Sequence, residues 1–199
     1  GIFEGPLKDD YATTALWRTA MLDAQKDVYF ADSIITYDST ATTTITGLSH
    51  LEGETVKVLT DGAVHTDETV ASSQITLDTS SSVVQVGLGY THRIKGLKIE
   101  GGTAAGTAQG KKKRIYGLTF AVLDAMTMSY GPAKDDLIEI DFRIVSDPMD
   151  DPVPLFTGEK FIEFEGDWGT DPRIVVESDD PVPFTLLAIM PETDVKEIK

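Results

Sequence analysis

A succession of short runs rich in β-branched residues limits what this chain can fold into. The runs "SIITYD", "TTTITGL", "TVKVLTD", "QITLD" and "VVQVG" lie between residues 33 and 87 and are separated by turn residues. In "VLTDGAVH", Asp61-Gly62 lies between two strand-like runs, and this dipeptide is a strong hairpin signal. Strands this short and closely spaced favour a small barrel or sandwich over a parallel sheet. We therefore predict a small β-barrel-like domain over residues 28–100.

Longer strands are predicted in the second half. In "LIEIDFRIV", apolar residues alternate with Glu139, Asp141 and Arg143, which is typical of an antiparallel sheet with one solvated face. We predict an antiparallel β-sandwich over residues 111–199, joined to the first domain by a glycine-rich loop at 101–110. A single continuous sandwich is the alternative. Either arrangement makes the fold mainly β.

One helix is predicted, over residues 12–24, within an N-terminal segment 1–27 that we expect to link to a region upstream. Its apolar stripe comprises Leu16, Trp17, Ala20, Met21 and Ala24. Asp10 is the expected N-cap. No run approaches 18 apolar residues, so no membrane-spanning segment is predicted.

A proline motif occurs twice in the second half. "DDPVP" begins at Asp150 and again at Asp179. Each X-Pro pair favours extended backbone, and the second copy leads into a predicted strand. We predict two equivalent loop-to-strand corners, with a peptide-docking motif as the alternative.

Few side chains are arranged for catalysis or metal binding. The 199 residues include no cysteine, which excludes disulfides, thiolate metal sites and a cysteine nucleophile, and no Gly-x-Ser-x-Gly motif is present. The three histidines are far apart, so no zinc site is predicted. Asp147, Asp150 and Asp151 carry carboxylates of the kind that bind calcium, but they lack the spacing of a calcium loop and alternate with prolines. We assign no catalytic, cofactor-binding or metal residue and expect no enzyme activity.

Charge is unevenly distributed along the chain. The formal net charge is −16, which opposes general nucleic-acid binding. Residues 81–123 carry seven basic side chains against Glu100 alone, so this segment is +6 and the rest of the chain is −22. A basic segment on an acidic body indicates contact with acidic neighbours, including other copies of the chain.

The stretch "GGTAAGTAQGKKKR" (residues 101–114) ends in a run of four cations. It does not fit a phosphate-binding loop, because Ala105 and Lys112 occupy the positions that need Gly and Ser or Thr. Three interpretations remain for Lys111, Lys112, Lys113 and Arg114: a mobile loop with solvated cations, a subunit contact, or a nucleic-acid contact. No aromatic residue is interleaved with them to stack on bases. Trp168 and Tyr90 are candidate exposed aromatic residues.

An ordered string of motifs across residues 30–191 resembles one protein family. "DSIITYDSTATTTITGLSHLEGETVKVLTDGAVH" is followed by "VVQVGLGYTHRIKGLKIE", "GTAQGKKKRI", "DPMDDPVPLFTGEK" and "PVPFTLLAIMP". The string is similar to the C-terminal region of tail structural proteins of tailed bacteriophages and prophages, of the tail tubular protein B-like nozzle or hub type. The resemblance implies a structural subunit in a symmetric ring and brings no catalytic residues. Its hallmark at Gly106–Ile115 implies a backbone crossover followed by an anchoring basic run.

From these observations we expect a non-enzymatic component of the virion tail, made in the bacterial host cytoplasm. The expected partners are other copies in a ring, neighbouring tail proteins and, passively, packaged DNA, with no membrane and no small-molecule substrate. A receptor- or glycan-binding module at the tail tip is the alternative, and a glycan-cleaving tail enzyme is a third possibility.

Overall fold

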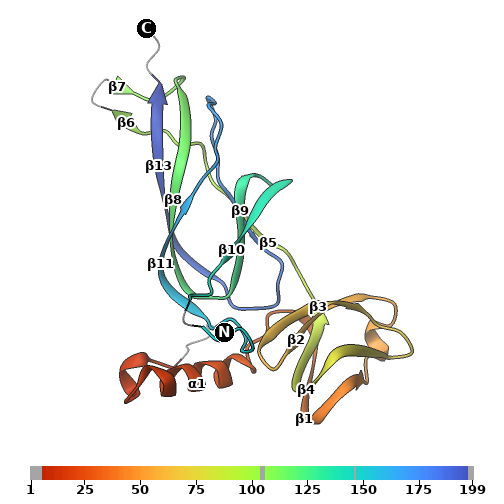
Figure 1. The fold of residues 1–199 in the computed structure, drawn as a ribbon. Helices are drawn as coiled ribbons and strands as arrows, with labels where there is room; N and C mark the ends of the chain where they lie inside the picture. The colour runs from red at the N-terminus through yellow and green to blue at the C-terminus, as the bar shows by residue number, and fades with distance from the viewer. Residues whose placement is uncertain (1–5, 104–105, 146, 197–199) are drawn as a thin grey trace.

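The computed structural model describes residues 6–103, 106–145 and 147–196 (Figure 1). These residues form three antiparallel sheets, a two-stranded ribbon and one α-helix, which confirms the predicted mainly β fold class. Within the described ranges, no helix is long and apolar enough to cross a membrane.

The helix begins later than predicted. Lys8–Asp10 form a short 3-10 helix (η1), and the α-helix (α1) spans Thr14–Gln25. The N-cap is Thr13, whose hydroxyl accepts a hydrogen bond from the Leu16 N–H at 3.2 Å, so the prediction of Asp10 was wrong. Most of the predicted stripe faces the protein: Met21 is buried and Trp17 is half-buried against the same cluster. Leu16 is the exception, at 54% exposed, while Gln25, which was not in the stripe, is buried. Tertiary contacts at the C-terminal half of the helix decide which side is buried.

The first sheet is four-stranded, with the order β1-β4-β2-β3 and every neighbour antiparallel. Its strands are β1 (Asp32–Thr46), β2 (Thr55–Thr60), β3 (Ala63–Thr69) and β4 (Gln74–Leu88), and η2 (Ser49–Leu51) follows β1. Its core comprises Ile45, Leu48, Leu51, Val56, Val58, Val70, Ile75, Leu77, Val84 and Val86. The long strand β4 pairs with both β1 and β2, which leaves β1 and β3 as the edges.

The predicted Asp61-Gly62 hairpin is confirmed. These residues connect β2 to β3 with φ of 48° and 86°, the left-handed conformations that a two-residue hairpin turn requires. The Asp61 carboxylate accepts hydrogen bonds from the Val83 N–H at 3.0 Å and from the N–H and hydroxyl of Ser82 at 3.2 and 2.9 Å. Burial opposes ionisation, but these hydrogen bonds outweigh it and lower the pKa of Asp61 below its ordinary value.

The other two large sheets pack face to face as a sandwich (Figure 1). One has the order β10-β9-β12-β5 and the other β11-β8-β13. The strands are β5 (His92–Lys95), β8 (Lys112–Ala125), β9 (Thr127–Ala133), β10 (Asp136–Asp141), β11 (Phe156–Glu163), β12 (Val175–Ser178) and β13 (Thr185–Lys196). The shared core includes Leu118, Phe120, Val122, Met128, Tyr130, Ile140 and Val176. Gly131, where β9 turns toward β10, has no room for a side chain, because a Cβ there would lie 1.8 Å from the Asp136 carbonyl oxygen.

The chain changes from the first sheet to the sandwich earlier than predicted. β5 pairs with β12, from His92 opposite Ser178 to Lys95 opposite Val175, so the crossover falls at residues 89–91 and not at 101–110. The glycine-rich stretch belongs to the sandwich side. It contains a short ribbon of β6 (Gly102–Thr103) and β7 (Gly106–Thr107), and its Ala104 and Ala105 lie outside the described residues.

The helix, the first sheet and the sandwich meet at one junction. Its apolar cluster comprises Met21, Leu59, Met126, Leu155 and Val182. Gln25 is 1% exposed, and its Nε2 donates to the carbonyl oxygens of Gly62 at 2.7 Å and Val153 at 3.0 Å. Val153 and Val182 come from the two proline motifs, and each motif leads directly into a strand, as predicted. The two proline motifs therefore form two corners through which the sandwich packs against the helix and the first sheet.

Candidate functional site

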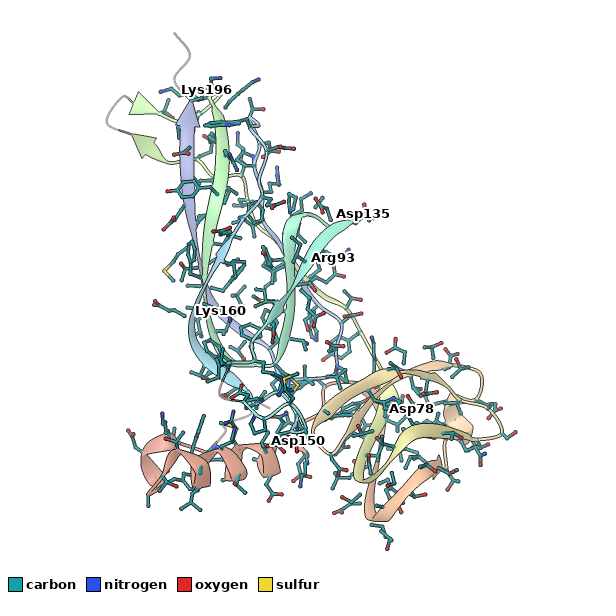
Figure 2. The ribbon with its side chains drawn as sticks, in the orientation of Figure 1. Asp78, Arg93, Asp135, Asp150, Lys160 and Lys196 are labelled. Carbon is teal, nitrogen blue, oxygen red and sulfur yellow. The ribbon has the colours of Figure 1, made fainter. Side chains whose placement is uncertain are left out.

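The long strands β8 and β13 form a ribbon that extends away from the junction (Figure 1). The start of β8 and the end of β13 lie at its far end, where Figure 2 labels Lys196, while Asp150 lies beside the junction. In the register, Lys112 is opposite Lys196 and Arg114 is opposite Asp194. The predicted basic run therefore begins a strand at the far end of the sandwich.

A third segment runs beside the start of β8. After β11, the Phe164 N–H donates to the Tyr116 carbonyl at 2.9 Å, and Gly169 and Lys113 exchange two backbone hydrogen bonds of 2.7 and 2.9 Å. Between these contacts, a Cβ at Gly166 would lie 2.6 Å from the Ile115 carbonyl oxygen, so glycine permits the close approach. The segment places Trp168, which is 44% exposed, next to the basic run.

Lys113 differs from its neighbours because its side chain points into the protein. It is 1% exposed, and its Nζ lies 3.0 Å from the Ile99 carbonyl oxygen and 3.1 Å from Glu100 Oε1. Lys98 Nζ lies 2.9 Å from the same carboxylate oxygen, and the hydrogen bonds from Lys98 and Lys113 lower the pKa of Glu100. Lys113 is therefore not available to a partner, which corrects the prediction of four contacting cations.

Four exposed side chains at this end form what we call the tip surface: Lys112, Arg114, Tyr116 and Trp168. Glu192, Asp194 and Lys196 of β13 are exposed beside them. Lys111 is half-buried just before β8. The negative charge of Glu192, with burial and Asp194, raises the pKa of Tyr116. Cations beside aromatic rings suit contact with an acidic protein surface.

An apolar row continues this face along the ribbon. Phe161 of β11 and Met190 of β13 lie opposite Thr119 of β8 on its two sides, and they are 55% and 41% exposed. The tip surface is thus one end of a longer sheet face that carries aromatic and apolar side chains.

Tyr90 lies elsewhere. It is 47% exposed, and its ring centroid is 4.3 Å from that of His92. With Lys57, Asp67 and Asp179 it lines a pocket of about 220 Å³, and Lys57 Nζ lies 3.0 Å from Asp67 Oδ1 and 3.4 Å from Asp179 Oδ2. The two candidate aromatic residues therefore do not form one patch.

The predicted acidic loop is held by arginines. Asp147 is buried and forms an ion pair with Arg18, and its Oδ2 accepts a hydrogen bond from the Ile144 N–H at 2.9 Å. The Arg143 guanidinium donates to the backbone carbonyls of Pro148 and Asp151. In the part of the chain that the structure describes, no three or more histidine, aspartate or glutamate side chains are grouped to hold a metal ion.

Sequence reasoning missed the inward orientation of Lys113 and the place of Tyr116 in the tip surface. Alternation from the buried Ile115 is the signal for the orientation of Lys113. For Tyr116 alternation alone is no guide, because an irregularity in the pairing with β13 between Ile115 and Gly117 shifts the buried positions from odd to even numbers. Comparison with known proteins adds no further residues: no family model matches the chain, and no curated protein matches it.

Proposed function

We propose that this chain is a non-enzymatic structural subunit of a phage or prophage tail, of the nozzle, tail-tube or hub type, and that it acts in virion assembly. The motif string supports the tail assignment. The observation that supports a role in assembly is the tip surface, where Lys112 and Arg114 are exposed beside Trp168 at the end of the ribbon. A subunit that binds its neighbours through strand ends needs such an exposed, charged and aromatic surface.

In this proposal the tip surface of one copy contacts an acidic face of the next copy in a ring. Residues outside 81–123 carry a net charge of −22, so acidic surface is plentiful on each copy. Opposite charges across an interface steer association and fix its register. Neighbouring tail proteins are the other partners, and an acidic wall would repel the phosphates of packaged DNA during passive contact. The protein would be made in the host cytoplasm and reside in the virion tail.

The contact is tested by replacing two cations and keeping the third. Lys112→Ser with Arg114→Ser removes exposed charge, whereas Lys113 stays in its ion pair. The matched control is Lys134→Ser with Lys8→Ser, which removes two exposed cations away from the tip. Light scattering and negative-stain microscopy should show higher oligomers of the wild type and the control, weakened by salt, and their loss in the tip variant. Equal assembly of both variants would contradict the proposed contact.

The location is tested separately by immunogold labelling of induced phage particles with an antibody to this chain. Gold on the tail is expected. Labelling of host cells or free protein, with none on intact particles, would contradict the tail assignment.

The second candidate function is a receptor- or glycan-binding module at the tail tip. The exposed Trp168 beside Arg114 favours it, since an aromatic face with a nearby charged group can bind a sugar ring. Binding to a glycan array or to host cells that is lost in Trp168→Ala, together with unchanged assembly, would support this function over the first.

A further inference from the structure

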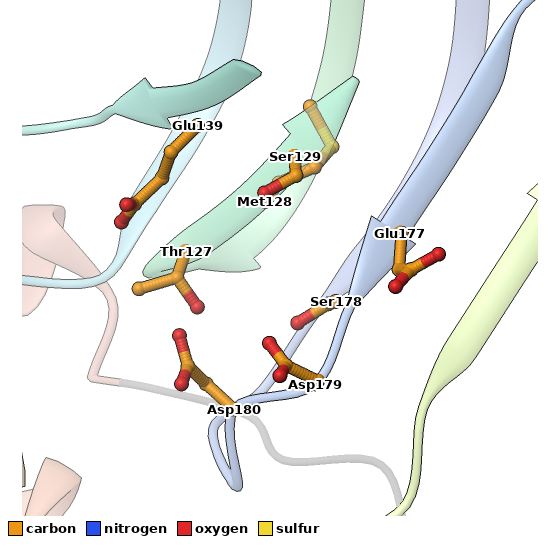
Figure 3. Close-up of a pocket in the computed structure, with 8 residues that line it drawn as sticks. All are labelled: Thr127, Met128, Ser129, Glu139, Glu177, Ser178, Asp179 and Asp180. Carbon is orange, nitrogen blue, oxygen red and sulfur yellow. The ribbon is translucent and has the colours of Figure 1, made fainter. Parts of the chain in front are cut away.

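A polar pocket of about 170 Å³ lies where β9 and β12 separate (Figure 3). Backbone pairing between these strands ends at Glu177 opposite Ser129, and beyond this point the side chains of Thr127, Ser178, Asp179 and Asp180 surround the pocket. The pocket therefore occupies a fork in the sheet, well away from the tip surface.

Two hydroxyl groups at this fork lack hydrogen-bond partners in the part of the chain that the structure describes. Ser178 is 5% exposed, and neither its Oγ nor the buried Thr127 Oγ1 has a hydrogen-bond partner among the described residues. Figure 3 shows both hydroxyls directed toward the space that Asp179 and Asp180 border. Buried polar atoms are nearly always satisfied in native proteins, so these two oxygens indicate a bound species that completes the pocket.

The carboxylates at the fork differ in how well they are neutralised. Glu177 forms an ion pair with Arg93, and Asp179 Oδ2 lies 3.4 Å from Lys57 Nζ. Within the described ranges, Asp180 and Glu139 have no ion-pair partner. Apart from Met128, the side chains that line the pocket thus offer only oxygen atoms, and their four carboxylates outnumber the two cations paired with them.

We propose that this pocket binds a calcium ion between Asp179 and Asp180, with the hydroxyls of Thr127 and Ser178 and water as further ligands. Calcium takes six to eight oxygen ligands in irregular geometry, whereas magnesium requires a near-ideal octahedron. Calcium affinity falls as the number of carboxylate ligands falls. Because this pocket offers only two, we expect weak binding, with Kd on the order of 10⁻⁴ to 10⁻³ M. The ion ties the ends of β9 and β12 together at the place where their backbone pairing stops.

The proposal is tested on the full chain by calorimetric titration with CaCl₂ and by thermal unfolding. We expect saturable binding in the stated range and a Tm increase of about 3–6 °C at 10 mM calcium for a Kd of about 1 mM. EGTA should reverse the shift, and NaCl of equal ionic strength should not reproduce it. Asp180→Asn should lower the affinity at least tenfold, and Ser178→Ala is a second variant that removes one neutral ligand. Asp135→Asn, at the exposed turn between β9 and β10 (Figure 2), is the matched control and should bind as the wild type does.

Several outcomes would overturn the proposal. They are the absence of saturable binding, an equal response in Asp180→Asn and the wild type, or a shift that NaCl reproduces. Any of these would mean that the pocket holds water alone. Because assembly through the tip surface is measured separately, this result is independent of the proposed function.

Discussion

Replacing Lys113 by methionine should destabilise the protein strongly. From the sequence alone, this residue would be expected on the surface, because it belongs to a run of four cations. Methionine keeps most of the aliphatic stem of lysine and its packing. It removes the amine that donates to the Ile99 carbonyl at 3.0 Å and lies 3.1 Å from Glu100 Oε1. The perturbation therefore isolates the polar interactions of one buried side chain.

The expected loss follows from these contacts. Removing one partner of a buried ion pair costs about 3–5 kcal/mol, because the other partner is left unpaired. Here Lys98 Nζ remains 2.9 Å from the same Glu100 oxygen, so the carboxylate keeps a cation. The loss is then mainly that of the amine and its hydrogen bond to a buried carbonyl, and we expect about 2–3 kcal/mol. In a chain of this length, this corresponds to a decrease in Tm of about 4–12 °C.

Urea denaturation followed by circular dichroism measures this loss, and Lys112→Met is the control. Lys112 is exposed on the same strand, so its replacement should change the free energy of unfolding by less than about 0.5 kcal/mol. Equal urea midpoints for Lys113→Met and the wild type would refute the reasoning, because they would mean that the contacts of the Lys113 amine do not stabilise the fold.

Three further substitutions test other parts of the fold. Gln25→Leu removes the donor to two carbonyls at the junction, one buried and one partly buried, and should cost about 2–3 kcal/mol in guanidinium unfolding. A loss below about 0.5 kcal/mol would contradict its bridging role. Asp61→Asn should lower the free energy of unfolding by about 1 kcal/mol at pH 7. Because the pKa of Asp61 is lower in the folded protein, the ionised carboxylate stabilises the fold, and this stabilisation is lost as the pH falls through that pKa. The difference from wild type should therefore disappear in unfolding measured near pH 2. Gly131→Ala should cost about 1–3 kcal/mol or more, since its Cβ would overlap the Asp136 carbonyl, whereas Gly101→Ala, which has open space, should be near neutral in thermal unfolding.

Local patterns predicted the elements whose causes are local. The Asp61-Gly62 turn and the corners formed by the proline motifs each depend on a few neighbouring residues, and both are present. The alternation predicted for "LIEIDFRIV" holds only in part: Ile140 and Phe142 are buried, but Ile138 and Ile144 are exposed, and β10 ends at Asp141. The buried part of α1 packs against Leu59 and Val182, which are distant in sequence, so the apolar residues of the helix alone placed Met21 correctly but could not exclude the exposed Leu16. Long-range pairing likewise places β5 in the sandwich, because its partner β12 lies about eighty residues later.

The candidate site shows why a run of like charges cannot be interpreted as one group once it enters a strand. Successive side chains of a strand point to opposite faces, so four consecutive cations must divide between the interior and the surface. Lys113 takes the interior position because Ile99 and Glu100, at the entry to the β6–β7 ribbon, supply a carbonyl and a carboxylate there. Lys112 and Arg114 are thereby fixed on the outer face beside Trp168. The buried lysine is what orients the exposed pair, so a test of the proposed contact is informative only when Lys113 is left in place.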